Sequence, residues 1–176
     1  MLPALVALCL VVKRNAPLAE ATRQSCLEVP MLPPSNGVTG QNDPGAAIEP
    51  ALTADNEQRF ARGYQAFYSE RYDSALIDFS WLVMSQPWSW RAHVALAGTL
   101  MMTREYQGAM NFYGYALMLD GGHPEPVYQM GVCLQAMGRL ADARMALHSA
   151  ISMSDDKPHY SAVRANAHSL LNQLLV

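Results

Sequence analysis

Hydrophobic positions beyond residue 55 recur three and four residues apart, the spacing of helices with one buried face. The pattern predicts seven helices, over residues 56–69, 72–85, 90–103, 106–119, 124–137, 140–153 and 158–175. Pro87 and Gly121-Gly122 separate pairs of helices, and Pro124 stands in a first helical turn, where proline is tolerated. Asp155-Asp156 is expected to cap the last helix.

The helical part of the chain aligns with itself at an offset of 34 residues. Six columns agree in three consecutive units: Gly63, Ala97 and Gly131; Ala75, Ala109 and Ala143; Phe79, Tyr113 and Leu147; Tyr72, Tyr106 and Leu140; Leu82, Ala116 and Ala150; Phe60, Val94 and Tyr128. This is the period of the tetratricopeptide repeat (TPR), a pair of antiparallel helices. We expect the small residues of each first helix to face the alanines of the second, and the large residues at 79, 113 and 147 to fill the gap toward the next repeat.

The predicted fold is therefore all-α, a TPR helical solenoid of three helix-turn-helix repeats with a C-terminal capping helix. The repeats cover about residues 56–89, 90–123 and 124–157, the capping helix covers 158–175, and together they form a domain over 53–176. Each repeat leaves an apolar face open, so stacking and a final cap complete the core.

Residues 1–52 read as an irregular leader rich in proline and glycine. Their first twelve residues are apolar but too few to span a bilayer. Positive charges follow this run, whereas a secretory signal carries them in front. The segment before Cys9 also has a likeness to a lipoprotein signal, and Met31 is an alternative start, with the preceding residues then an artefact of gene-start assignment.

The first helices of the repeats are expected to line a concave groove. At the groove-facing offsets of the repeat stand mostly aromatic residues and methionines, and an exposed surface of this kind marks a binding site. The predicted groove residues are Phe60, Tyr64, Phe67, Tyr68, Arg91, Val94, Met101, Met102, Tyr128 and Gln135. Tyr64, Phe67, Tyr68 and Met101 are not expected in the core, whereas Met118, Met130 and Met145 are expected to face neighbouring helices and fill it.

The composition and the absence of known motifs argue against several classes of function. Hydrophobic residues make up 51% of the chain and charged residues 15%, and the formal net charge is -3, which argues against general nucleic-acid binding and against a basic membrane-surface protein. The three cysteines have no metal-binding or redox spacing, and Cys133 is expected to be a small buried side chain in a reducing compartment. Histidines are scattered, and no nucleophile elbow, phosphate loop or paired acids occur, so we expect no metal, no cofactor and no enzymatic activity.

Several segments go beyond what a generic repeat requires. They are Ile77-Asp78-Phe79-Ser80-Trp81-Leu82-Val83-Met84, Gln86-Pro87-Trp88-Ser89-Trp90-Arg91-Ala92-His93, Asn111-Phe112-Tyr113-Gly114 and His123-Pro124-Glu125-Pro126-Val127-Tyr128-Gln129. With them the chain from residue 55 onward resembles the class II chaperones of type III secretion systems, the LcrH/SycD-like TPR family, and most of all the SscB/CesD type.

That resemblance implies a bacterial cytoplasmic chaperone that holds a hydrophobic translocator or effector protein in its groove before secretion. It also implies two further partners, a second copy of the chain and a transcriptional regulator. Family members usually begin with a short amphipathic helix used in dimer contacts, whereas residues 1–52 are irregular in pattern. The alternative function, suggested by Cys9, is an exported TPR lipoprotein that serves as an assembly scaffold.

Overall fold

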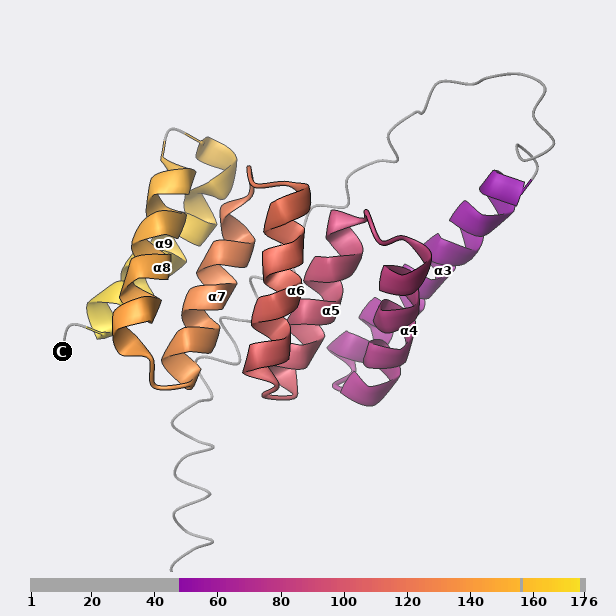
Figure 1. Ribbon diagram of the computed structural model, residues 1–176, viewed down its shortest axis with the longest axis horizontal. Coiled ribbons are helices and arrows are strands. Elements are labelled where there is room, and N and C mark those ends of the chain that lie inside the picture. Colours follow the sequence, from indigo (N-terminus) through magenta and orange to yellow (C-terminus); the bar gives the residue numbers. More distant parts are fainter. Residues whose placement is uncertain (1–47, 156, 175–176) are drawn as a thin grey trace, which may run out of the picture.

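The computed structural model describes residues 48–155 and 157–174, and the chain there is helical throughout, with no strand. Six of the helices form antiparallel pairs, and the last lies mainly on α8 (Figure 1). The helices are α3 (Ile48–Tyr68), α4 (Tyr72–Ser85), α5 (Trp90–Met102), α6 (Tyr106–Leu119), α7 (Pro124–Ala136), α8 (Leu140–Ser154) and α9 (Ser161–Gln173), with a short 3₁₀ turn η2 (Pro158–Tyr160) before α9. The predicted three-repeat solenoid with a final helix is confirmed.

The turn inside each repeat has the same geometry. Glu70, Arg104 and Gly138, which are 34 residues apart, all have positive φ, of 60°, 67° and 77°. In the first repeat the Arg71 N–H donates to the carbonyl of Ala66 at 2.9 Å, and the corresponding bonds recur in the other two repeats. This pattern satisfies the last carbonyls of the first helix and turns the chain back on itself.

The paired helices approach closely where the first helix carries glycine. A Cβ on Gly63 would lie 2.7 Å from the Phe79 ring, and one on Gly131 would lie 3.0 Å from the Leu147 side chain. The sequence prediction placed the second-helix alanines opposite these glycines and turned Phe79 and Leu147 toward the next repeat. Ala143 does lie near Gly131, with its carbonyl oxygen 3.6 Å from the Cβ position, but the prediction missed that Phe79 and Leu147 press against the glycines of their own repeat.

Two hydrophobic clusters make up the interior. One joins α3, α4 and the first half of α5 around Phe79, and the other joins α5 to α9 around Tyr113 and Leu147. The last helix closes the second cluster with Val163, Leu170 and Leu171, as its pattern predicted. Leu175 lies outside the described residues. The expectation that Met118 and Met145 lie in the core was wrong, because they are 82% and 63% exposed.

The other end of the stack carries ion pairs. The buried Asp78 of α4 accepts a hydrogen bond from Arg62 Nε at 3.0 Å and lies 3.7 Å from Arg59 Nη1. The Arg59 guanidinium also stacks on the Trp81 ring, 3.8 Å from its centroid. A terminal repeat needs a polar outer surface, and these residues supply it.

Two predicted boundaries were wrong. The first helix begins at Ile48, not at residue 56, because the segment has strong helix formers after Pro50, which stands in the first turn where no N–H is needed. Asp155 does not cap the last helix: it ends α8, and α9 begins after η2 without a side-chain cap. The remaining leader with Cys9 and Met31, and Asp156, lie outside the described residues.

Candidate peptide-binding face

The first helices of the repeats, α3, α5 and α7, form one side of the stack, here called the inner face. In Figure 1, α4 lies in front of α3 and α6 in front of α5, so the inner face points away from the viewer. Its residues stand at the same five places of each repeat: positions 57, 60, 64, 67 and 68 on α3, 91, 94, 98, 101 and 102 on α5, and 125, 128, 132, 135 and 136 on α7.

A ladder of three aromatic rings runs along α3. Phe60 and Tyr64 stack with ring centroids 6.3 Å apart, and Tyr64 and Tyr68 follow at 6.2 Å. Residues four apart lie one above the other on a helix, so this spacing creates a continuous stripe. Tyr68 and half-buried Tyr64 bring the stripe to the surface, whereas Phe60 at its other end is buried.

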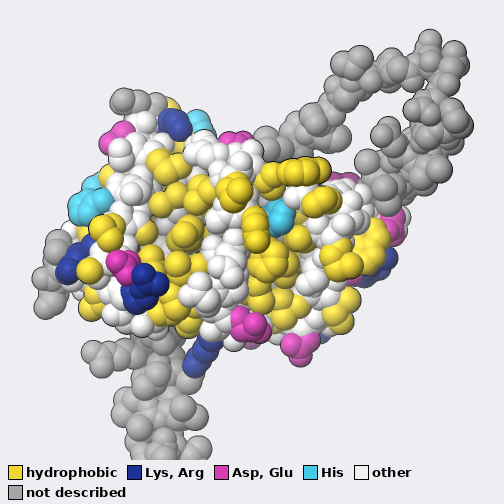
Figure 2. All heavy atoms as spheres, viewed as in Figure 1, with side chains coloured by type: hydrophobic (Ala, Val, Ile, Leu, Met, Phe, Trp, Pro, Cys, Tyr) yellow, Lys and Arg dark blue, Asp and Glu magenta, His cyan; other side chains and the backbone are white. Residues whose placement is uncertain are grey.

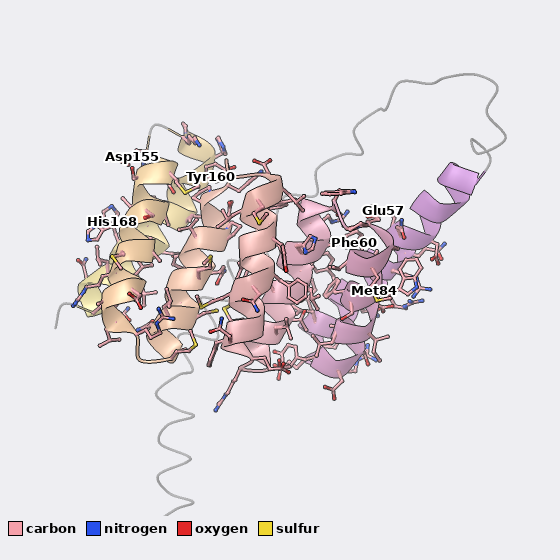
Figure 3. The ribbon with its side chains drawn as sticks, in the orientation of Figure 1. Glu57, Phe60, Met84, Asp155, Tyr160 and His168 are labelled. Carbon is pink, nitrogen blue, oxygen red and sulfur yellow. The ribbon has the colours of Figure 1, made fainter. Side chains whose placement is uncertain are left out.

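Arg91 of α5 joins this ladder to the second repeat. Its guanidinium carbon lies 4.0 Å from the centroid of the Phe60 ring, and its Nη1 donates to Glu57 Oε1 at 3.1 Å. Figure 3 shows Glu57 and Phe60 near each other on α3. Sequence reasoning missed Glu57, although its place exactly one repeat before Arg91 was a usable signal.

The same column continues on α7 with Glu125. Burial raises the pKa of this carboxyl, against a smaller opposing effect of its backbone hydrogen bond and of His123 and His159. The column therefore alternates in charge, with Glu57, Arg91 and Glu125 on successive first helices.

The predicted groove residues divide by exposure. Tyr68 is exposed, at 50%, while Tyr64, Arg91, Val94, Met102 and Gln135 are half-buried. Phe60, Phe67, Met101 and Tyr128 are buried, each at 5% exposure or less. The expectation that Phe67 and Met101 lie outside the core was wrong: Phe67 packs edge-on against Tyr72 of α4 at 5.7 Å, and Met101 belongs to the second cluster.

Buried polar atoms without a hydrogen-bond partner gather on the first helices. They are Asn56 Oδ1, Trp90 Nε1, His93 Nδ1, Glu125 Oε2, Gln129 Oε1 and Gln135 Oε1. An unmet hydrogen bond in a buried group costs free energy, and these atoms are enclosed by the protein.

An aromatic and histidine cluster connects the second repeat, the third repeat and η2. The His123 ring lies 4.4 Å from the Trp90 ring, its Nδ1 is 2.9 Å from the Tyr160 hydroxyl, and its Nε2 is 3.2 Å from Asp120 Oδ2. Burial raises the pKa of Tyr160, and the carboxylates of Glu125 and Asp120 act in the same direction. These contacts hold the second repeat, the third repeat and η2 together. Within residues 48–155 and 157–174, no group of three metal-ligating side chains occurs.

The chain matches known proteins in both sequence and fold. Residues 100–167 match the tetratricopeptide repeat family model. Low calcium response locus protein H of Yersinia pseudotuberculosis is 24% identical over 118 residues, which are 67% of this chain and 70% of that protein. Both matches agree with the resemblance to the LcrH/SycD-like class II chaperones of type III secretion systems.

Solved structures of type III secretion chaperones have the same fold as this chain. PcrH in complex with the chaperone binding region of PopD, from Pseudomonas aeruginosa, is 23% identical, with a TM-score of 0.67 over 70% of this chain and 92% of that one. Yersinia enterocolitica SycD in complex with a peptide of the translocator YopD is 23% identical, with a TM-score of 0.64 over 68% and 91%. No helix within the described part of the chain is long and apolar enough to cross a membrane.

Proposed function

We propose that this protein is a bacterial cytoplasmic chaperone that binds an extended hydrophobic segment of a type III translocator protein, without catalysis. The observation that carries the proposal is the aromatic ladder of Phe60, Tyr64 and Tyr68, bordered by Arg91 on the neighbouring helix. The relatives PcrH and SycD have been solved with segments of the translocators PopD and YopD, which supports this choice of client.

The inner face suits such a client chemically. Half-buried Tyr64, Val94 and Met102 offer apolar surface at which client side chains would be removed from water, each contributing about 1.5–3 kcal/mol before ordering costs. An extended segment has unpaired main-chain N–H and C=O groups, and the amide of half-buried Gln135 can pair with them. An extended, apolar segment therefore satisfies both needs of the surface.

Co-expression tests the proposal. The chain should form a soluble complex with the hydrophobic secreted protein encoded beside it, and Tyr64→Glu with Met102→Glu should abolish the complex. Met102 is chosen over Met101 because Met101 is only 4% exposed, and a charge there would disrupt the core.

The controls place the same charge on exposed second-helix positions, with Asn111→Glu and Ser152→Glu. They should leave the complex intact. Retention of the client by the Tyr64 and Met102 variant would exclude the inner face, provided that circular dichroism shows both variants folded.

A further inference from the structure

Four of the five histidines stand toward the end of the stack that carries α8 and α9. They are His123, His148, His159 and His168, and Figure 2 shows histidine side chains at that end. Of these four, His123 is half-buried, while the other three are exposed. A histidine that polar groups partly enclose changes its contacts when it takes up a proton, because its ring nitrogens then both donate.

Groups from four elements surround the His123 ring, which stands at the N-terminal end of α7. Asp120, at the end of α6, lies 3.2 Å from Nε2, and Trp90 of α5 packs on the ring with centroids 4.4 Å apart. The Tyr160 hydroxyl of η2 lies 2.9 Å from Nδ1, and Glu125 Oε2 of α7 lies 3.8 Å from the same nitrogen. We call the four titratable members the His123 cluster: His123, Asp120, Glu125 and Tyr160.

Other charged groups on the surrounding elements have contacts of their own. Lys157 Nζ donates to the carbonyl of Gly122 at 3.3 Å, which is a second link between the start of η2 and the turn before α7. The exposed His159 ring lies against the Tyr160 ring, with centroids 4.0 Å apart. Two ion pairs lie farther out, Arg91 with Glu57 and Arg164 with Asp155.

The contacts of His123 determine where its hydrogen lies. The Asp120 carboxylate only accepts hydrogen bonds, so Nε2 carries the hydrogen. In the neutral ring Nδ1 is then an acceptor, and the Tyr160 hydroxyl donates to it. Glu125 Oε2, which is buried without a hydrogen-bond partner among the described residues, faces the same nitrogen. A neutral His123 and an ionised Glu125 therefore place two acceptors against each other.

One proton from solvent removes this conflict. Nδ1 is the favoured place for it, because the imidazolium then lies between the carboxylates of Asp120 and Glu125. The new N–H donates to the Tyr160 oxygen, and a hydrogen bond from a charged donor is roughly twice as strong as one between neutral groups. The link between His123 and η2 is therefore stronger in the protonated state.

This link acts on the capping helix. The 3₁₀ turn η2 leads directly into α9, whose Val163 closes the second hydrophobic cluster. That cluster also contains Met101 and Tyr128 of the inner face. A stronger hydrogen bond at Tyr160 therefore holds the beginning of α9 in place and keeps the cluster beneath the inner face closed.

We propose that the His123 cluster is a pH-sensitive latch, which holds the capping helix α9 more firmly at mildly acidic pH than above neutrality. His123 is a positioning residue in this latch, because it acts on α9 through Tyr160. The latch belongs to the folded chain itself, so the proposal does not depend on which client the inner face binds.

Hydrogen exchange of the full chain, followed by mass spectrometry of its peptides, measures the latch. Protection factors relative to an unstructured chain at the same pH are compared at pH 5.5 and pH 7.5, for residues 158–173 and for α4 as the reference. Ordinary carboxylates stay ionised over this range, whereas histidine changes its charge. Relative to α4, the protection of residues 158–173 should rise about three- to tenfold from pH 7.5 to pH 5.5, the gain expected from one charge-assisted hydrogen bond.

Two variants remove the latch and keep the fold. His123→Asn leaves an amide near the position of Nδ1, and asparagine is favoured at the N-cap of α7. Tyr160→Phe removes only the hydroxyl group. In both variants the protection of α9 relative to α4 should be the same at the two pH values. The matched control is His168→Asn, an exposed position on α9 about two helical turns from Tyr160 (Figure 3), and it should keep the wild-type rise.

Three results would overturn the proposal. The first is equal protection of wild-type α9 at both pH values, or a rise that α4 shares, which would reflect the stability of the whole chain. The second is an unchanged rise in His123→Asn or Tyr160→Phe, because a merely structural role lowers protection equally at both pH values. The third is loss of the rise in His168→Asn, which would assign the pH dependence to the exposed histidine.

Discussion

Replacing Gly63 by alanine tests how closely the helices of the first repeat approach each other. The added methyl carbon would lie 2.7 Å from Phe79 Cε1 and 3.0 Å from Cζ, whereas carbon atoms prefer about 3.5–4.0 Å. Phe79 is fully buried and has little room to turn away. Overpacking of this kind costs about 1–3 kcal/mol, while alanine in a helix regains up to about 1 kcal/mol over glycine.

Gly114 of α6 provides the matched control. A Cβ there would meet no atom within 4 Å, so Gly114→Ala gains the helix propensity without a clash. The difference in unfolding free energy between the Gly63 and Gly114 variants therefore isolates the overpacking, about 1–3 kcal/mol in favour of the Gly114 variant. Gly131→Ala should fall between them, because its nearest neighbour is a leucine at 3.0 Å, which can adjust its rotamer.

Urea unfolding followed by far-ultraviolet circular dichroism measures all three variants against the wild type. A Gly63→Ala variant as stable as the Gly114→Ala variant would refute the close packing that this prediction assumes.

Three more predictions concern buried groups. Asp78→Asn should lower the unfolding free energy by roughly 1–2 kcal/mol, which is less than for a fully buried ion pair because the Arg62 side chain is 58% exposed. The control Asp73→Asn, on the exposed side of α4, should leave the unfolding free energy unchanged. Equal urea midpoints for the two variants would contradict this prediction. Burial raises the pKa of Cys133 to about 12, so iodoacetamide at pH 8 should label this thiol only after the protein unfolds. Peptide mass spectrometry measures the labelling, and rapid labelling of the native protein would count against a buried thiol. The raised pKa of Glu125 means that the folded state binds its proton more tightly than the unfolded state, so this residue lowers stability at neutral pH and the penalty fades as pH falls toward the ordinary carboxyl range. The thermal midpoint of Glu125→Gln relative to wild type should therefore be higher at pH 7.5 than at pH 4.5, and a difference that does not change with pH would be evidence against it.

The repeat could be predicted because its signals are local and periodic. Helices α4 to α8 lie within one or two residues of their predicted ranges, since small, aromatic and alanine columns recur every 34 residues. Cys133 is fully buried, as predicted for a short side chain on an inward-facing position. The sequence indicated the left-handed backbone conformation of the turns only at Gly138, because glycine favours it. Glu70 and Arg104 adopt the same conformation although their side chains do not favour it, because the helix packing on either side fixes the turn.

Side-chain surroundings were predicted less well, for physical reasons. Phe67 and Met101 sit near the ends of first helices, where the turn brings α4 and α6 close and adds burial that a helical period does not reveal. Met118 shares its apolar character with core methionines, yet its helix has no neighbour on that side. The residue type alone cannot distinguish a buried from an exposed methionine. The burial of Phe67 and Met101 depends on which helix packs against them, and the exposure of Met118 follows because no helix packs against it.

Photo-crosslinking from the inner face tests the central claim most directly. In the complex formed by co-expression, a photoreactive benzoylphenylalanine replaces Tyr64 on α3 or, as the comparison, Met118 on α6. We expect position 64 to crosslink to the translocator within its apolar segment, and position 118 to give no crosslink to it. Crosslinking of the client from position 118 and not from position 64 would contradict binding on the inner face.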